Sequence, residues 1–310
     1  MVNAFEISPL LAEQATRPTA TQRVSGPPTV SPADQFAMIV ITLGLLALGL
    51  WLVRRLTHGR KLLLHDAPGR PNHLGWIHIV VIAGWLLADR GMALAASLRD
   101  QTLESVTSEV LVGAVVLQMA MLAIALGAAH VGFRRGIVRG MGLSTRRWFI
   151  DIARGLLAGL AVFPVCMVLA RLSEVLIPET FQEAHGVLVF LNEDASLSGK
   201  LLAVTLAVLV APVVEEVLYR GILQTALRRV LGGPWAGILV AGGIFTIAHL
   251  EFAGDPTRPV GLQAFAPLFA LAVVLGYNYE RTGRLLPSII THCFFNAVNV
   301  VVALLPGGAP

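Results

Sequence analysis

Residues 201–223 read LLAVTLAVLVAPVVEEVLYRGIL, and this stretch decides the fold. No charged residue precedes Glu215 in it, and about twenty apolar residues in helical form cross the ~30 Å hydrocarbon core of a bilayer. Two adjacent glutamates then follow inside the apolar run. A charged side chain within a membrane span costs several kcal/mol, so such residues are candidates for function. The stretch predicts a membrane helix that carries part of a site.

The rest of the chain has the same character, because 55% of its residues are hydrophobic and only 14% are charged. Typical soluble domains have roughly 45–50% and about 25%. We therefore expect an all-α, polytopic transmembrane helical bundle of about eight spans. The expected spans are residues 36–53, 74–88, 110–131, 150–170, 201–223, 236–250, 262–279 and 285–305.

The spans suggest three regions along the chain. Residues 1–35 are rich in Pro, Thr, Ser and Gln, a composition that cannot build a packed core, and we expect a disordered tail. The tail lacks the layout of an ordinary signal peptide. Residues 36–199 would hold the first four spans, and residues 200–310 would form a catalytic transmembrane core of the last four.

Positive charge predicts the orientation, since cytoplasmic loops are enriched in Lys and Arg. Basic clusters follow the first, third, fifth and seventh spans: Arg54, Arg55, Arg60, Lys61 and Arg70; Arg134, Arg135, Arg139, Arg146 and Arg147; Arg228 and Arg229; Arg281 and Arg284. Both termini would then lie outside the cytoplasm. We expect the protein to be an integral, multi-pass protein of a prokaryotic-type inner membrane. The same rule explains these clusters without nucleic acid, so we expect membrane lipid and no nucleic acid as partners. Cys166 and Cys293 lie in apolar runs and predict no disulfide or cysteine zinc site.

The adjacent glutamates have different surroundings on their own helix. Glu216 and Arg220 are four residues apart, so they share a helical face and can form an ion pair. Glu215 points about 100° away and has no such partner. A carboxylate without a local partner in a span needs water, a metal or a distant cationic group.

Two later spans add polar residues at helical spacing. GIFTIAHLEF places Phe245 and His249 one turn apart, and LPSIITHCFFNAVNVV places His292 and Asn296 likewise. A histidine can exchange protons with a water held by Glu215, and His292 and Asn296 offer N–H donors to an oxyanion. Taken singly, a span histidine or asparagine can also be interhelical glue. His249 lies about fourteen residues from the inner end of its span and His292 about eight, a mismatch in depth of roughly 9 Å.

These residues form three ordered motifs: E-E-x-x-x-R (Glu215, Glu216, Arg220), F-x-x-x-H (Phe245, His249) and H-x-x-x-N (His292, Asn296). Together with YERTGRLLPSIITHCFFN at 279–296, they resemble the CPBP family of CAAX proteases and bacteriocin-processing enzymes, also called the Abi family. The resemblance covers about residues 211–299.

The resemblance implies an intramembrane glutamic endopeptidase without a cofactor. Glu215 and His249 would activate a water, and His292 and Asn296 would stabilise the oxyanion, with Glu216, Arg220 and Phe245 in support. The substrate would be a membrane-associated peptide or protein, and prenylated CAAX-type proteins are one candidate class.

Three other interpretations stay open. Glu215, His249 and His292 also form a two-His, one-Glu set, which is a known catalytic zinc ligand set and would make the protein a metalloprotease. Ionisable residues in spans also mark transporters and ion sites, although the sequence shows no inverted repeat. The third interpretation is a non-catalytic scaffold of the bacteriocin-immunity type. Sequence motifs of serine, aspartate and HEXXH zinc intramembrane proteases are absent.

Overall fold

The computed structural model describes residues 30–57, 64, 67–68, 72–98, 108–143, 145–178, 196–252 and 259–307. Most of the predicted disordered tail, residues 1–29, lies outside the described residues. The first helix begins at Pro32, four residues before the predicted first span.

Within these ranges every predicted span has a helical counterpart. The helices are α1 (Pro32–Thr57), α2 (Trp76–Leu98), α3 (Ser108–Gly132), α5 (Trp148–Leu176), the continuous helix Leu197–Leu231, α10 (Pro234–Ala248), α11 (Phe265–Thr282) and α12 (Leu286–Leu304). Of the described helices, α1, α5, Leu197–Leu231, the segment Leu262–Thr282 and α12 are long and apolar enough to cross a membrane. The apolar parts of α2, α3 and α10 are shorter. The helical membrane bundle is confirmed, and eight crossings remain a prediction.

Short elements connect the helices. They are α4 (Gly136–Gly140), the 3₁₀ turns η3 (Thr145–Arg147) and η7 (Leu262–Ala264), and an antiparallel pair of β1 (Glu251–Phe252) and β2 (Pro259–Val260). Glycines in the left-handed conformation end two helices, at Gly232 (φ 77°) and Gly283 (φ 67°). Pro234 and Pro287 occupy the first turns of α10 and α12, where a missing N–H costs nothing.

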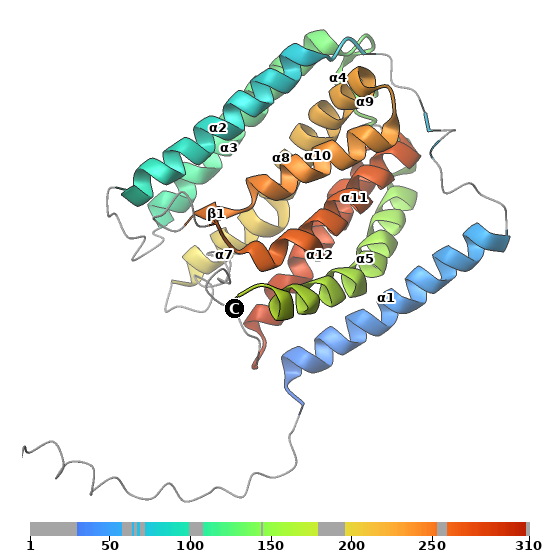
Figure 1. Cartoon of the computed structure of the whole chain (residues 1–310), viewed down its shortest axis with the longest axis vertical. Coiled ribbons are helices and arrows are strands. Elements are labelled where there is room, and N and C mark those ends of the chain that lie inside the picture. Colours follow the sequence, from blue (N-terminus) through green and yellow to red (C-terminus); the bar gives the residue numbers. More distant parts are fainter. Residues whose placement is uncertain are drawn as a thin grey trace, which may run out of the picture.

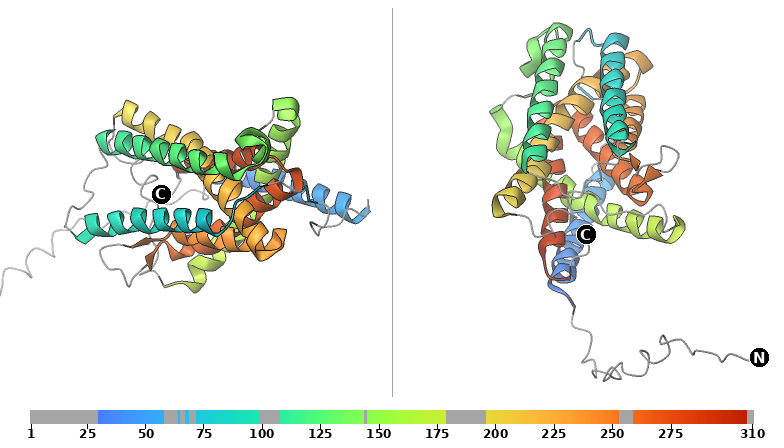
Figure 2. Two further views of the ribbon diagram at one scale, coloured as in Figure 1. Left: turned by 90° about the horizontal axis from the view of Figure 1, so that it is seen from above. Right: turned by 90° about the vertical axis from the view of Figure 1, so that its left-hand side faces the viewer.

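The helices lie side by side in the order α10, α11, α5 and α1 across the bundle, with α12 behind them (Figure 1). α5 contacts α1, α11 and α12, and α10 contacts α11 and the end of Leu197–Leu231. Helices α2 and α3 both pack on Leu197–Leu231. The end of α3 at Gly132 lies beside His78 in the first turn of α2, and a gap separates the two ribbons farther along in Figure 2.

Small residues let the central helices approach closely. A methyl group at Gly155 would meet Ile290 of α12 at 2.6 Å, and one at Gly159 would meet Phe294 at 2.6 Å. A methyl group at Gly44 of α1 would collide with the Leu160 carbonyl of α5. Interfaces of this kind are typical of membrane helices, because association in lipid depends on van der Waals packing.

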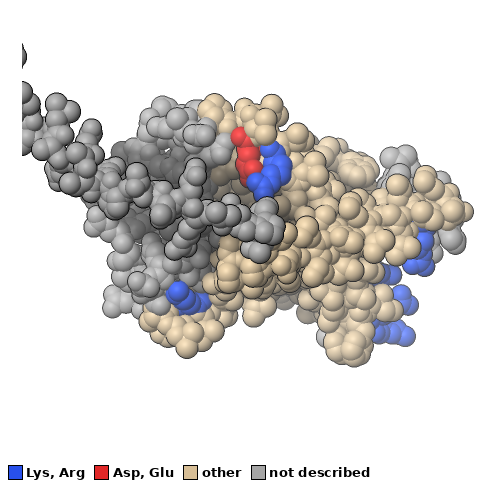
Figure 3. Space-filling view, turned by 90° about the horizontal axis from the view of Figure 1, so that it is seen from below, with Lys and Arg blue, Asp and Glu red and all other residues tan. Residues whose placement is uncertain are grey.

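Contacts between distant segments gather the arginine-rich connections at one end of the bundle. Arg55 bonds Tyr277, Arg228 pairs with Glu280, and Arg284 pairs with Asp151. At the other end Ala33 N donates to Pro306 O, so the start of α1 and the end of α12 lie together. In Figure 3, Lys and Arg side chains gather at the right-hand end of the molecule, and a few more charged side chains lie near the grey region. The broad surface between these two groups shows no Lys, Arg, Asp or Glu. Which end faces the cytoplasm remains a prediction.

The start of α12 lies inside the bundle, beside the first turns of α5. α12 runs beside α5 in the same direction, with Arg284 beside Asp151 and Gly155 beside Ile290. It therefore begins about one turn, ~5.4 Å, deeper than α5. Pro68 packs against Gly283 at the α11–α12 turn, and Leu285 is fully buried.

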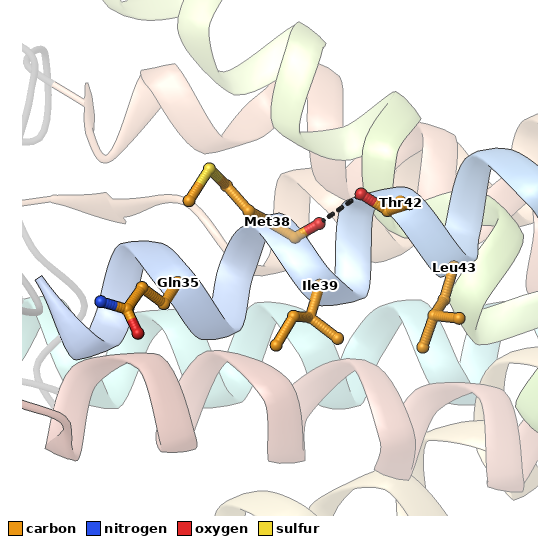
Figure 4. Close-up of a pocket in the computed structure, with 5 residues that line it drawn as sticks. All are labelled: Gln35, Met38, Ile39, Thr42 and Leu43. Carbon is orange, nitrogen blue, oxygen red and sulfur yellow. Dashed lines mark hydrogen bonds between the residues drawn. The ribbon is translucent and has the colours of Figure 1, made fainter. Parts of the chain in front are cut away.

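The described part of the chain also has a shallow cavity of about 470 Å³ on α1 (Figure 4). Its lining residues are Gln35, Met38, Ile39, Thr42 and Leu43. Met38 and Ile39 are at least half exposed, as expected for a helix that faces lipid. None of the lining residues belongs to the motifs.

Candidate active site

The helix that carries the adjacent glutamates is interrupted by two π-helical segments. It consists of α7 (Leu197–Thr205), the π segment η5 (Leu206–Val210), α8 (Ala211–Glu215), the π segment η6 (Glu216–Gln224) and α9 (Thr225–Leu231). A π turn widens the helix and is frequent at functional sites. Glu215 and Glu216 lie at the junction between an α and a π segment.

Asn296 supplies a hydrogen bond to the first π segment that Pro212 cannot make. The N–H of Ala211 reaches back to Leu206 O, which is the π pattern. The next residue in that pattern would donate to Ala207 O, but Pro212 has no N–H. Asn296 Nδ2 donates to Ala207 O at 2.8 Å instead. One amide hydrogen of Asn296 therefore ties α12 to the helix Leu197–Leu231, and the second remains for another acceptor.

Glu215 lies between the two histidines that the sequence singled out. His249 Nε2 and His292 Nε2 are each 3.7 Å from Glu215 Oε2. This distance is too long for a direct hydrogen bond, and a water that bonds Glu215 and a histidine together would lie beside the line that joins the two atoms. The Glu215 and His249 side chains are 23% and 24% exposed, so water can reach them. Three helices thus bring together three of the four predicted catalytic residues.

His249 is held by the last turn of its own helix. It is the C-terminal cap of α10, and its Nδ1 lies 2.7 Å from Phe245 O. A carbonyl oxygen only accepts, so Nδ1 must carry the hydrogen. A neutral His249 therefore turns the lone pair of Nε2 toward Glu215.

Glu216 joins two motifs in the buried part of the site. Its Oε1 lies 2.9 Å from Arg220 NH1 and 3.0 Å from His292 Nδ1. Glu216, Arg220 and His292 are at most 3% exposed. The predicted Glu216–Arg220 pair is present in the structure. The bond from Glu216 to His292 was not predicted, because helical spacing gives contacts within one helix and not between helices.

Phe245 fills the space between these groups. Its ring lies 4.2 Å from the His249 ring and 5.8 Å from the His292 ring, and the Arg220 guanidinium carbon lies 4.5 Å from its centroid. Tyr219 packs edge-on at 5.0 Å. A fully buried ring with these contacts fixes both imidazoles, and a cation over its face is favourable.

The alternative zinc site has both support and difficulty in this geometry. Both Nδ1 atoms lie beside oxygen acceptors, and both Nε2 atoms face one carboxylate, as in many histidine metal sites. In the described ranges, however, no three His, Cys, Asp or Glu side chains converge closely enough to hold a metal ion. Glu215, His249 and His292 would have to move inward to bind zinc together.

Comparisons with known proteins agree with the motifs. Residues 197–298 match the family model described as Type II CAAX prenyl endopeptidase Rce1-like. An Escherichia coli protein described as "Uncharacterized 24.3 kDa protein" is 27% identical over 110 residues, which are 35% of this chain and 48% of that protein. The chain thus spans about half the length of this curated relative. No solved structure matches significantly.

The matched segment contains every residue of the three motifs. The family resemblance inferred from Glu215, His249, His292 and Asn296 is therefore confirmed for residues 197–298. The helices α1, α2, α3 and α5 lie outside the matched segment.

Proposed function

We propose that the protein is an intramembrane endopeptidase, from the premise that residues 197–298 are Rce1-like. In this proposal a water activated by Glu215 and His249 hydrolyses the peptide bond. The observation that supports this most directly is the position of Glu215 Oε2, 3.7 Å from both His249 Nε2 and His292 Nε2. A water between these atoms can give its proton to the carboxylate as it attacks a carbonyl carbon.

We assign His292 to the oxyanion and take it to be protonated, and the charges of the site support this role. With neutral histidines, Glu215, Glu216 and Arg220 carry a net charge of −1 in a mostly buried cluster, which is costly. A protonated His292 cancels this charge and donates from both nitrogens, with Nδ1 toward Glu216 and Nε2 toward the reaction site. The second amide hydrogen of Asn296 adds a donor. Together they would stabilise the oxyanion of the tetrahedral intermediate.

The remaining steps return the site to its starting state. The carboxylate of Glu215 holds the proton taken from water. When the intermediate collapses and the C–N bond breaks, Glu215 gives this proton to the leaving amine. No atom of the enzyme becomes covalently attached to the substrate.

The substrate class follows from the name of the matched family, which refers to prenylated CAAX proteins. We expect purified protein in detergent to cleave a farnesylated CAAX-type peptide, and to cleave the same peptide without the lipid more slowly. Product masses from the two peptides locate the bond. Equal cleavage of both peptides would remove the lipid from the proposal, and cleavage of neither would argue against this substrate class.

We also expect activity to persist after dialysis against a strong chelator, because His292 supplies the positive charge and Glu215 the base. In the alternative, zinc held by Glu215, His249 and His292 would act as a Lewis acid toward the water. Elemental analysis of chelator-washed, active protein separates the two. About one zinc per chain, with activity lost on removal and restored by zinc, would establish the metalloprotease.

A further inference from the structure

Outside the active site, three side chains from three helices meet at the arginine-rich end of the bundle. Arg55 in the last turn of α1 donates from NH2 to Tyr277 OH of α11 at 3.1 Å. The ring of Trp235, in the first turn of α10, lies 6.0 Å from the Tyr277 ring. The centroid of the Trp51 ring lies 5.4 Å from the Arg55 guanidinium carbon, a favourable cation–π distance.

Two hydrogen-bond donors of this group have no acceptor within the part of the chain that the structure describes. Arg55 NH1 and Trp235 Nε1 are both shielded from solvent and make no hydrogen bond. A buried donor left unpaired costs roughly 1–3 kcal/mol, and more when the group is charged. Tyr277 accepts from Arg55, so its own hydroxyl hydrogen is also available. Donors that collect around one tyrosine indicate an acceptor that the described residues do not supply.

We propose that Arg55, Trp235 and Tyr277 bind the phosphate of a membrane phospholipid, with preference for an anionic headgroup. A guanidinium offers paired N–H groups that match phosphate oxygens, and indole and phenol donors suit the boundary between headgroups and acyl chains. All three residues are partly exposed, and a small outward turn of the Arg55 and Trp235 side chains would bring their shielded nitrogens to a headgroup.

The surroundings favour a lipid over a free ion. α1 exposes a long apolar surface before Arg55, where acyl chains can lie; its exposed residues include Leu45, Leu46, Leu52 and Val53. The proposal does not depend on peptidase activity.

The test uses the delipidated full chain in detergent and measures the lipid bound by native mass spectrometry during titration with phosphatidylglycerol. Trp235→Phe keeps an aromatic ring and removes only the N–H, and Arg55→Gln removes the charge. We expect affinity to fall about tenfold for Arg55→Gln, as for loss of a charged hydrogen bond, and severalfold for Trp235→Phe. Arg54→Gln is the matched control, since it removes an exposed arginine from the same turn, and its affinity should stay within about twofold.

Two further measurements sharpen the outcome. Without lipid, Trp235→Phe should melt no lower than the native protein, because its N–H has no acceptor to lose. Addition of phosphatidylglycerol should raise the melting temperature of the native protein more than that of Trp235→Phe. Equal losses for Arg54→Gln and Arg55→Gln, or unchanged lipid binding by Trp235→Phe, would overturn the proposal. Inorganic phosphate that binds as tightly as the lipid, with the same dependence on Arg55, would identify a free anion as the ligand instead.

Discussion

Glu215→Gln is expected to lower peptide cleavage by roughly 10²–10⁴-fold, the contribution of a general base. Glutamine has the same shape but cannot take a proton from water. The side chain is 23% exposed and makes no buried ion pair with an arginine, so the substitution should leave folding intact. Initial rates on a cleaved peptide, at matched protein concentration and matched melting temperature, measure the effect.

His249→Gln is the companion variant and should also lower cleavage strongly. Its Nε2 faces Glu215, and glutamine cannot place an equivalent lone pair while bonded to Phe245 O. Cys166→Ala is a suitable control because this thiol bonds Pro267 O, outside the motif residues. If either active-site variant keeps near-native turnover, the proposed base and its partner are wrong.

Arg220→Ala is expected to destabilise the protein by ~3–5 kcal/mol, because it leaves the buried cluster of Glu215, Glu216 and His292 with an uncompensated negative charge. Both side chains are at most 2% exposed, and Arg220 also contacts the Phe245 ring and Ala272 O. The loss of folded protein should exceed the loss of turnover in the molecules that remain folded. Thermal unfolding in detergent and the yield of monodisperse protein report the change.

The chain contains a matched control for this effect. Arg171 and Glu174 form an ion pair at the same distance, 2.9 Å, but their side chains are 74% and 44% exposed. Arg171→Ala should therefore cost less than about 1 kcal/mol. The double variant Glu216→Gln with Arg220→Met removes both charges and should recover part of the stability. An unchanged melting temperature for Arg220→Ala would refute the buried pair.

The family match explains why the site was easier to recognise than the rest of the chain. Every motif residue falls within residues 197–298, and the motifs lie on three separate helices in a fixed order. Helices α1, α2, α3 and α5 carry no such motif, and the described contacts show how they pack on the rest of the bundle. α5 supplies the glycine surface for α12, and α2 and α3 cover the helix that holds Glu215.

The sequence by itself determined the all-helical class and where the helices occur along the chain, because both depend on local properties. Apolar length predicts a membrane helix wherever the residues lie in space, and the four-residue spacing of Glu216 and Arg220 is a property of one helix. The same reasoning separated Glu215 from its neighbour, since adjacent helical residues point about 100° apart.

Only the tertiary structure decided which groups from different helices meet. The bond from Glu216 to His292, the donation from Asn296 to the carbonyl left free by Pro212, and the depth of α12 all depend on how helices cross. Side-chain spacing fixes a direction on each helix, but the distance between helices is set by packing, here by Gly155 and Gly159 against α12. A single sequence records the residues at such a crossing without recording that they are neighbours.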